Sequence, residues 1–203
     1  MITGIVGKLY QVTNARMPVP TDDEIMCGNG KTMTNAYFCL LDAVERDRWV
    51  ITNYKTDFST YMDAQEIFDD FFERENVTYG ITEIQKFLNS LGKTQNKVWV
   101  EGAVSQRRKL GADIIWDSQR IMSVDNRIRE HTKIYLIPKK YHKSDGSPCQ
   151  DEDCELPHFI KVYCDKPLGI IDPIAIIDCE EIGEHYNTNE ICYDTLTARG
   201  VKL

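Results

Sequence analysis

Segments with the apolar spacing of strands alternate along this chain with segments that have the spacing of helices. Short apolar runs rich in β-branched residues predict buried strands at 2–6, 48–54, 77–84, 112–119 and 133–138. Apolar residues recurring at intervals of three and four predict helices at 32–46, 63–75, 98–111 and 123–131. Because parallel strands need long crossover connections, this alternation predicts a three-layer α/β fold with a mainly parallel central sheet.

The pattern changes after Pro138. Apolar runs at 159–164 and 169–179, with turn signals between them, predict an antiparallel hairpin on the edge of the sheet, and the polar stretch 142–157 predicts a loop. A chain of 203 residues with 42% hydrophobic content suits one sizeable core. We therefore expect a single domain over 1–203, with a β-rich extension at 139–203.

Charge and cysteine usage restrict the class of protein. A net charge of -8 excludes a protein that coats nucleic acid over its whole surface, although basic runs at 106–109 and 138–143 leave a local basic site open. The seven cysteines are an odd number and no basic-then-apolar leader opens the chain, so we expect a reducing cytosol and no secretion. No apolar run approaches the roughly 18 residues of a transmembrane helix.

The run GNGKT at 28–32 opens the helix predicted at 32–46. Backbone N–H groups at such a helix end can bind phosphate, Lys31 can reach the β and γ phosphates, and the Thr32 hydroxyl can ligate Mg²⁺. The alternative is a glycine-rich turn between a strand and a helix, with no ligand.

The full phosphate-loop pattern requires a glycine where Ile25 stands. Joining Gly7 and Lys8 to Cys27 restores the pattern, so residues 9–26 are interpreted as an insertion within an otherwise complete loop. The predicted phosphate-binding residues are Gly7, Lys8, Cys27, Gly28, Asn29, Gly30, Lys31 and Thr32. The insertion raises the question of whether consecutive N–H groups can still converge on one phosphate.

Four stretches occur in an order that resembles the FtsK/HerA-like P-loop ATPases. They are GK…CGNGKT, VITNYKTDFS, YGITEIQKFLNS and SQRRKLGADIIWDSQRIMSVDNRIREHT. Within that group the chain resembles the packaging ATPases of double-jelly-roll viruses and the Zot-like phage proteins. The resemblance implies a RecA/FtsK-like P-loop fold, ATP and Mg²⁺ as cofactors, and double-stranded DNA as a partner. It also implies a homo-oligomeric ring, expected to be a hexamer, that could contact capsid or portal-vertex proteins in the host cytoplasm or virion.

The resemblance assigns roles to residues that follow two predicted strands. Glu83 matches the carboxylate that polarises the attacking water, whereas Thr82 stands where the family has the acid that holds Mg²⁺. Gln119 matches the residue that senses the γ-phosphate. Each of these residues could instead be an ordinary polar residue at a strand end.

Arginines after the second of these strands lie at subunit edges in ring ATPases. The resemblance implies that one of Arg127 and Arg129, with Arg120 behind them, reaches the neighbouring subunit's γ-phosphate. The basic residues at 107–109 could contact DNA phosphates, but a cap at a helix C-terminus is the reading we favour.

Cys149, Cys154, His158 and Cys164 are metal-competent and close in sequence. Zinc accepts such a set tetrahedrally, although the spacing matches no strong motif, and an incidental cluster in a hairpin loop is the alternative.

The residues and the resemblance together predict an ATP-dependent DNA translocase, a viral genome-packaging motor. Alternatives are a Zot-like phage-morphogenesis ATPase and a relative that binds nucleotide with weak or no hydrolysis, because of the insertion at 9–26 and of Thr82. A small-molecule kinase is a further reading that no lid or substrate motif supports.

Overall fold

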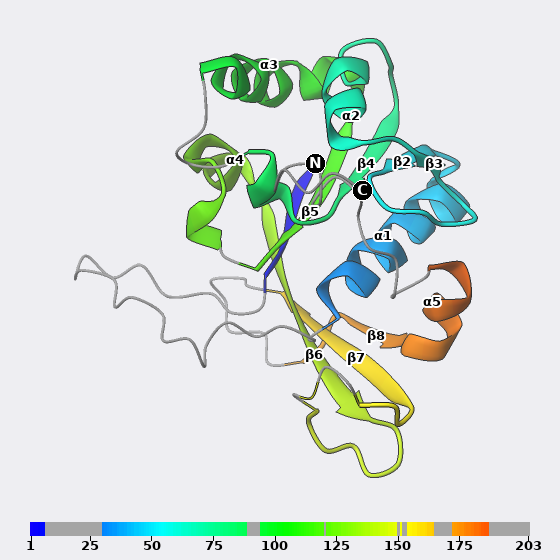
Figure 1. Cartoon of the computed structure of the whole chain (residues 1–203). Helices are drawn as coiled ribbons and strands as arrows, with labels where there is room; N and C mark the ends of the chain where they lie inside the picture. Colours follow the sequence, from blue (N-terminus) through cyan, green and yellow to red (C-terminus); the bar gives the residue numbers. More distant parts are fainter. Residues whose placement is uncertain are drawn as a thin grey trace, which may run out of the picture.

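A computed structural model describes residues 1–6, 30–88, 94–119, 121–149, 151, 154–164 and 172–186. At residue 6 and within 94–99 it describes the backbone alone. Eight strands form one sheet in the order β3-β2-β4-β5-β1-β6-β7-β8 (Figure 1). Their bounds are β1 Ile2–Val6, β2 Trp49–Thr52, β3 Thr60–Tyr61, β4 Val77–Ile81, β5 Asp113–Ser118, β6 Ile134–His142, β7 His158–Cys164 and β8 Ala175–Asp178.

The strands from β3 to β6 in this order pair in parallel, and β7 pairs antiparallel with both β6 and β8. The predicted α/β fold, with its mainly parallel sheet and antiparallel edge hairpin, is therefore confirmed. In this order β5 lies between β1 and β4, which brings the ends of these three strands to the same edge of the sheet.

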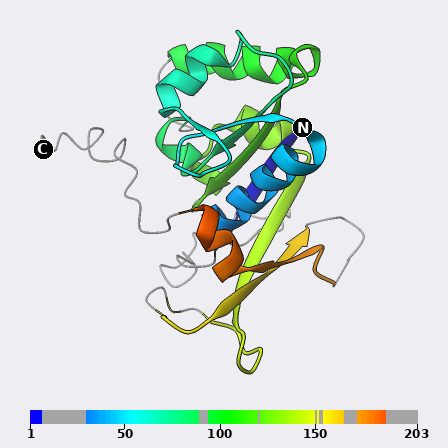
Figure 2. The ribbon, with the colours of Figure 1, turned by 90° about the vertical axis from the view of Figure 1, so that its right-hand side faces the viewer.

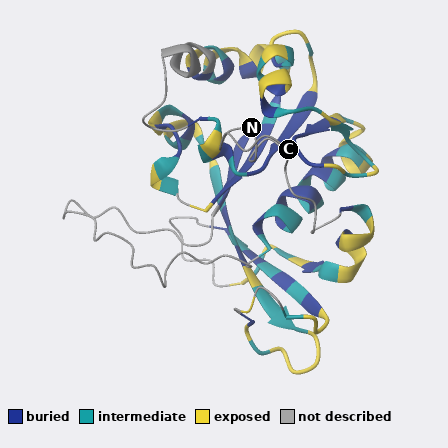
Figure 3. Ribbon diagram, viewed as in Figure 1, coloured by how far each residue is buried: buried dark blue, intermediate teal, exposed yellow. Residues whose placement is uncertain are grey.

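Helices cover both faces of the sheet, as Figures 1 and 2 show. One apolar core lies between the sheet and α1 and α5, and a second lies under α2, α3 and α4. Figure 3 shows the central strands as the buried layer between them. The helix bounds are α1 Lys31–Arg46, α2 Ala64–Asp70, α3 Thr94–Leu110, α4 Asn126–His131 and α5 Cys179–His185, with short 3-10 turns η2 Ile84–Lys86 and η3 Ile121–Ser123.

Four elements differ from the sequence expectation. Strand β4 ends at Ile81 because Glu83 takes a left-handed backbone conformation, with φ of 54°, before η2. Strand β6 continues past Pro138 to His142. This is possible because β6 pairs with β1 only up to Leu136, so the missing N–H of Pro138 removes no bond on that side. The two-residue β3 and helix α5 had no prediction.

Candidate functional site

A glycine precedes the first residue of α1, and the first turn of the helix contains no acidic residue. Gly30 is the N-cap with φ of 76°, and no side-chain hydrogen bond caps the helix among the described residues. A side chain at Gly30 would meet Ile160, since a Cβ would lie 2.3 Å from its Cδ1 atom. The first-turn N–H groups and the helix dipole therefore form a site suited to an anion.

Strands β1, β4 and β5 are parallel neighbours, so the residues after β4 and β5 share an edge of the sheet. Lys31, in the first turn of α1, is 8% exposed. Burial lowers the pKa of Lys31, and the negative charges of Asp117 and Glu83 oppose that shift. The negative charges of two carboxylates therefore act on Lys31: Asp117 at the end of β5 and Glu83 just after β4.

Asp117 is the acid of this site that the sequence analysis did not identify. It lies at the end of β5, on the side of the sheet that faces α1, and is fully buried. Its Oδ1 atom accepts a hydrogen bond of 3.0 Å from the backbone N–H of Glu83. Its Oδ2 atom is buried and has no hydrogen-bond partner among the described residues.

Burial raises the pKa of Asp117 to about 7, although the Glu83 N–H, the Lys31 charge and the Asn35 side chain work in the other direction. A buried oxygen without a partner is costly, so the site is suited to a cation or a hydrogen-bond donor. An acidic residue within the apolar run DIIWDS was the available signal in the sequence.

Glu83 follows β4 and lies beside Asp117, as the backbone hydrogen bond shows. Its carboxylate accepts a 2.8 Å hydrogen bond from the amide of Gln85 and lies 3.4 Å from the ammonium of Lys86. A left-handed backbone conformation is uncommon for glutamate and costs free energy. Such strained residues are often found at functional sites, where they direct a side chain toward a ligand.

Thr82 is held by Asn53 on the segment after β2. The Asn53 carbonyl oxygen accepts from the Thr82 N–H at 2.8 Å and from its hydroxyl at 3.3 Å, and the Asn53 amide donates to the Thr82 carbonyl at 3.1 Å. Both side chains are 2% exposed. Thr82 therefore tethers the end of β4 to the end of β2, which is a structural role.

The other predicted catalytic residues are Gln119, directly after β5, and two arginines of α4. Gln119 follows β5 directly and is exposed. Arg127 pairs with Asp125 and Glu101, at 3.0 and 2.6 Å. Arg129 donates to the carbonyl oxygen of Val124 at 3.1 Å. Both arginines are on α4, which covers the face of the sheet opposite α1 (Figure 1).

The basic run at 107–109 lies in the last turn of α3. The carbonyl oxygen of Leu110 accepts from the N–H of Asn76, just before β4 begins, so this run is at the edge opposite Lys31. Several predicted residues lie outside the described part of the chain: Gly7, Lys8, Cys27, Gly28, Asn29, Arg120 and the insertion 9–26.

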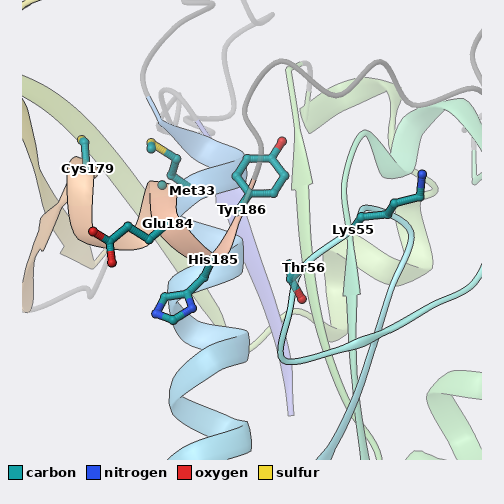
Figure 4. Close-up of a pocket in the computed structure, with 8 residues that line it drawn as sticks. Met33, Lys55, Thr56, Cys179, Glu184, His185 and Tyr186 are labelled. Carbon is teal, nitrogen blue, oxygen red and sulfur yellow. The ribbon is translucent and has the colours of Figure 1, made fainter.

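A pocket of about 490 Å³ lies beside the first turn of α1. Figure 4 shows Met33 of α1, Lys55 and Thr56 of the segment after β2, and Tyr186 after α5 around it. The pocket is a hollow open to solvent, and its volume is comparable to that of small-molecule sites, roughly 300–1,000 Å³.

One of the four predicted zinc ligands is wrong, because His142 takes the place of Cys164 in the cluster. His142 joins Cys149, Cys154 and His158 in one group of ligand atoms. Cys164 pairs with Leu136 at the other end of β7, whereas His158 pairs with His142. A strand rises about 3.3 Å per residue, so Cys164 is too far from His158 to share an ion with it.

Comparisons with known proteins support the fold. No protein-family model matches the chain, and no curated protein matches it either. Among solved structures, the N-terminal domain of zonular occludens toxin from Neisseria meningitidis is similar, with a TM-score of 0.50 and 15% identity over 91% of this chain and 97% of that one. The genome packaging NTPase of Sulfolobus turreted icosahedral virus 2, bound to ATP-gammaS, has a TM-score of 0.48 and 10% identity over 82% and 97%.

A KaiC-like protein from Pyrococcus horikoshii gives a TM-score of 0.44 and 10% identity, over 87% of this chain and 88% of that one. At these identities the likeness concerns the fold alone, and the zonular occludens toxin domain, with a TM-score of 0.50, is the neighbour that supports it. Within the described residues, no helix combines the length and the hydropathy needed to span a bilayer.

Proposed function

We propose that this chain binds ATP with Mg²⁺ at the carboxyl edge of β1, β4 and β5, hydrolyses it, and uses the hydrolysis to move double-stranded DNA. One observation carries the nucleotide part of the proposal. An uncapped N-terminus of a long helix, the buried Lys31 and the carboxylates of Asp117 and Glu83 gather at one edge of the sheet. This is the arrangement that phosphates and a divalent cation require.

The phosphates would lie against the N–H groups of the first turn of α1, with Lys31 as their cationic partner. The nucleoside would occupy the pocket beside Met33, because that pocket starts in the same turn of the helix. The predicted loop residues that precede Gly30 would complete the phosphate cradle.

The residues at this edge fit Mg²⁺. The unpartnered Oδ2 atom of Asp117 supplies an anionic oxygen, and the Thr32 hydroxyl supplies a neutral one. Asp117 on β5 would thus provide the negative charge for Mg²⁺. Thr82 cannot provide it, because its side chain is a neutral hydroxyl that is hydrogen-bonded to Asn53. When bound, Mg²⁺ would neutralise part of the negative charge on the phosphate oxygens.

Glu83 would hold the attacking water, since its carboxylate can accept a proton and its backbone is fixed by Asp117. Turnover requires the Glu83 carboxylate to leave Gln85 and Lys86 and to face the γ-phosphate. Gln119, exposed at the end of β5, would contact a γ-phosphate oxygen.

Coupling to DNA is supported by the order of the sequence motifs. In a ring of subunits, Arg127 or Arg129 of α4 would leave its present partner and reach the γ-phosphate of a neighbour. Capsid or portal-vertex proteins would then be partners in the host cytoplasm or virion.

ATP hydrolysis by the purified chain, with and without double-stranded DNA, tests the proposal. We expect Mg²⁺-dependent hydrolysis that DNA stimulates, in protein shown by native mass spectrometry to be oligomeric. Lys31→Ala should reduce it about 100-fold or more, and Lys133→Ala, which changes an exposed lysine, should leave it unchanged. Absence of hydrolysis in the oligomer, with and without DNA, refutes the proposal.

Asp117→Asn tests the assignment of the Mg²⁺ oxygen. We expect the affinity for ATP with Mg²⁺ to fall at least about tenfold, while the affinity for ATP in the presence of a chelator is retained. Equal losses in both conditions would count against a role for Asp117 with the cation.

A nucleotide-binding relative without turnover is the second candidate. The observation in its favour is the engagement of the Glu83 carboxylate by Gln85 and Lys86. This candidate predicts that Glu83→Gln leaves ATP binding intact and that the native chain does not hydrolyse ATP. Hydrolysis that Glu83→Gln abolishes excludes it.

A further inference from the structure

Metal-ligating side chains meet at the tip of the β6–β7 hairpin. His142 is the last residue of β6, His158 is the first residue of β7, and Cys149 and Cys154 are in the loop between them. Their ligand atoms all lie within 4.8 Å of one another. In Figure 1 the hairpin tip projects away from α2, α3 and α4, at the far end of the long strands.

Strand register brings the two imidazoles together. His142 and His158 are opposite one another in the antiparallel ladder, and side chains of such a pair lie on the same face. Their ring centroids are 4.8 Å apart with an interplanar angle of 36°. No sequence spacing shows this pairing, because it depends on how the two strands align.

Loop hydrogen bonds bring Cys149 back to the same place. The N–H of Cys149 donates to the carbonyl oxygen of Lys140 at 2.9 Å, and the N–H of His142 donates to that of Ser147 at 2.9 Å. The turn between them uses Gly146, whose φ of 71° suits a glycine. At the other end of the loop, the N–H of Lys143 donates to the carbonyl oxygen of Pro157 at 2.9 Å.

The imidazole nitrogens are buried without partners. His142 Nδ1 and His158 Nε2 have no hydrogen-bond partner among the described residues, although both atoms are inaccessible to water. His158 is 6% exposed and Cys149 is 5% exposed. Cys149 and Cys154 form no disulfide. Buried polar atoms of native proteins normally have a partner, so these two nitrogens are suited to binding a ligand.

We propose that His142, Cys149, Cys154 and His158 bind one Zn²⁺ ion at the tip of the β6–β7 hairpin. Two thiolates and two imidazoles form a common tetrahedral zinc set, and four protein ligands leave no open position, so the site is structural. Zn–S and Zn–N bonds of about 2.3 and 2.0 Å place tetrahedral ligand atoms roughly 3.3–3.8 Å apart. The observed 4.8 Å limit therefore requires only a small contraction.

The chemistry of the ligands selects the metal. Thiolates are soft ligands that favour zinc over the oxygen-seeking Mg²⁺ of the nucleotide site. The ion would fasten the loop 143–157 across the ends of β6 and β7, so that its binding free energy stabilises the tip. This site is separate from the edge that carries Lys31, and each can fail without the other.

Metal analysis of the full chain tests the proposal. We expect one zinc per chain by plasma mass spectrometry after purification without chelator. After zinc removal, Co²⁺ should give the visible absorption of a tetrahedral thiolate complex. Cys149→Ser and Cys154→Ser should each lower zinc affinity at least about tenfold. The control Cys164→Ser, which removes a buried thiol at the other end of β7, should retain one zinc.

A native chain that holds no zinc and gives no Co²⁺ absorption overturns the proposal, and so does equal zinc loss in Cys164→Ser. If the serine variants prove insoluble, His142→Cys decides, because three cysteines and one histidine also bind zinc tetrahedrally. A soluble His142→Cys chain with one zinc supports the site, and one without zinc counts against it. Lys31→Ala should keep its zinc, which distinguishes this test from that of the nucleotide site.

Discussion

Replacing Asp117 with asparagine tests whether a buried carboxylate at the end of β5 weakens the fold at neutral pH. Asparagine has nearly the same shape, and its carbonyl oxygen can still accept the 3.0 Å hydrogen bond from the Glu83 N–H. The substitution therefore removes the charge and leaves the packing of β5 in place.

Burial raises the pKa of Asp117 from 3.8 to about 7 in the folded protein. Between these two values the folded protein keeps a proton that the unfolded chain has released. The unfolded state then binds fewer protons than the folded state, so stability falls as the pH rises through this window.

The size of the effect follows from the pKa. One pKa unit corresponds to about 1.4 kcal/mol, so the full shift weakens the native chain by about 4 kcal/mol above pH 7. About 2–3 kcal/mol of that loss falls between pH 5 and pH 8. The asparagine variant lacks this loss, although its amide adds a cost of about 1–3 kcal/mol that does not change with pH.

Urea unfolding at pH 5, 6, 7 and 8, without metal or nucleotide, measures the difference. The free energy of unfolding of Asp117→Asn, relative to the native chain, should rise by about 2–3 kcal/mol from pH 5 to pH 8. Asp69→Asn, at an exposed position on α2, is the matched control and should show no such trend. A constant difference, or one that falls with pH, would refute the reasoning.

Other substitutions probe the same edge of the sheet. Thr82→Asp adds a second buried carboxylate close to Asp117, so urea unfolding at pH 8 should show a loss of at least about 2 kcal/mol, with no gain in hydrolysis. A faster and equally stable variant would contradict this. Gly80→Ala would place a Cβ 2.6 Å from Cys39 Sγ. Thermal unfolding should therefore show that the variant is about 1–3 kcal/mol less stable than the native chain, and an unchanged Tm would contradict this. Glu83→Gly should be about 1 kcal/mol more stable than Glu83→Ala, because φ is 54° there, and equal stabilities in urea would oppose this; both variants should lose ATP hydrolysis.

Local features of the sequence predict much of the fold. The alternation of strand and helix spacing predicts β1, β2, β4, β5 and the first half of β6, since apolar periodicity follows directly from which face each residue buries. The position of GKT at a helix start predicts α1 and places Lys31 in its first turn. The two-residue strand β3 escapes prediction because two residues are too few to show a periodic pattern.

The sequence predicts less of the site than of the fold. It identifies Lys31 and Glu83 from motifs, and the structure brings both near Asp117. It misses Asp117 because only the packing of β5 between β1 and β4 shows that this acid faces α1. The Asn53 tether of Thr82 is missed for the same reason, since β2 and β4 are distant in sequence.

The metal cluster shows the same division between sequence and structure. The sequence by itself determined that cysteines and a histidine follow one another in a loop before a strand, and hence that zinc was possible. Tertiary structure decided the fourth ligand, because antiparallel pairing places His142 opposite His158 and carries Cys164 to the other end of β7. Spacing along the chain reports which residues are near neighbours in a helix or strand, whereas strand register decides which distant residues share a site.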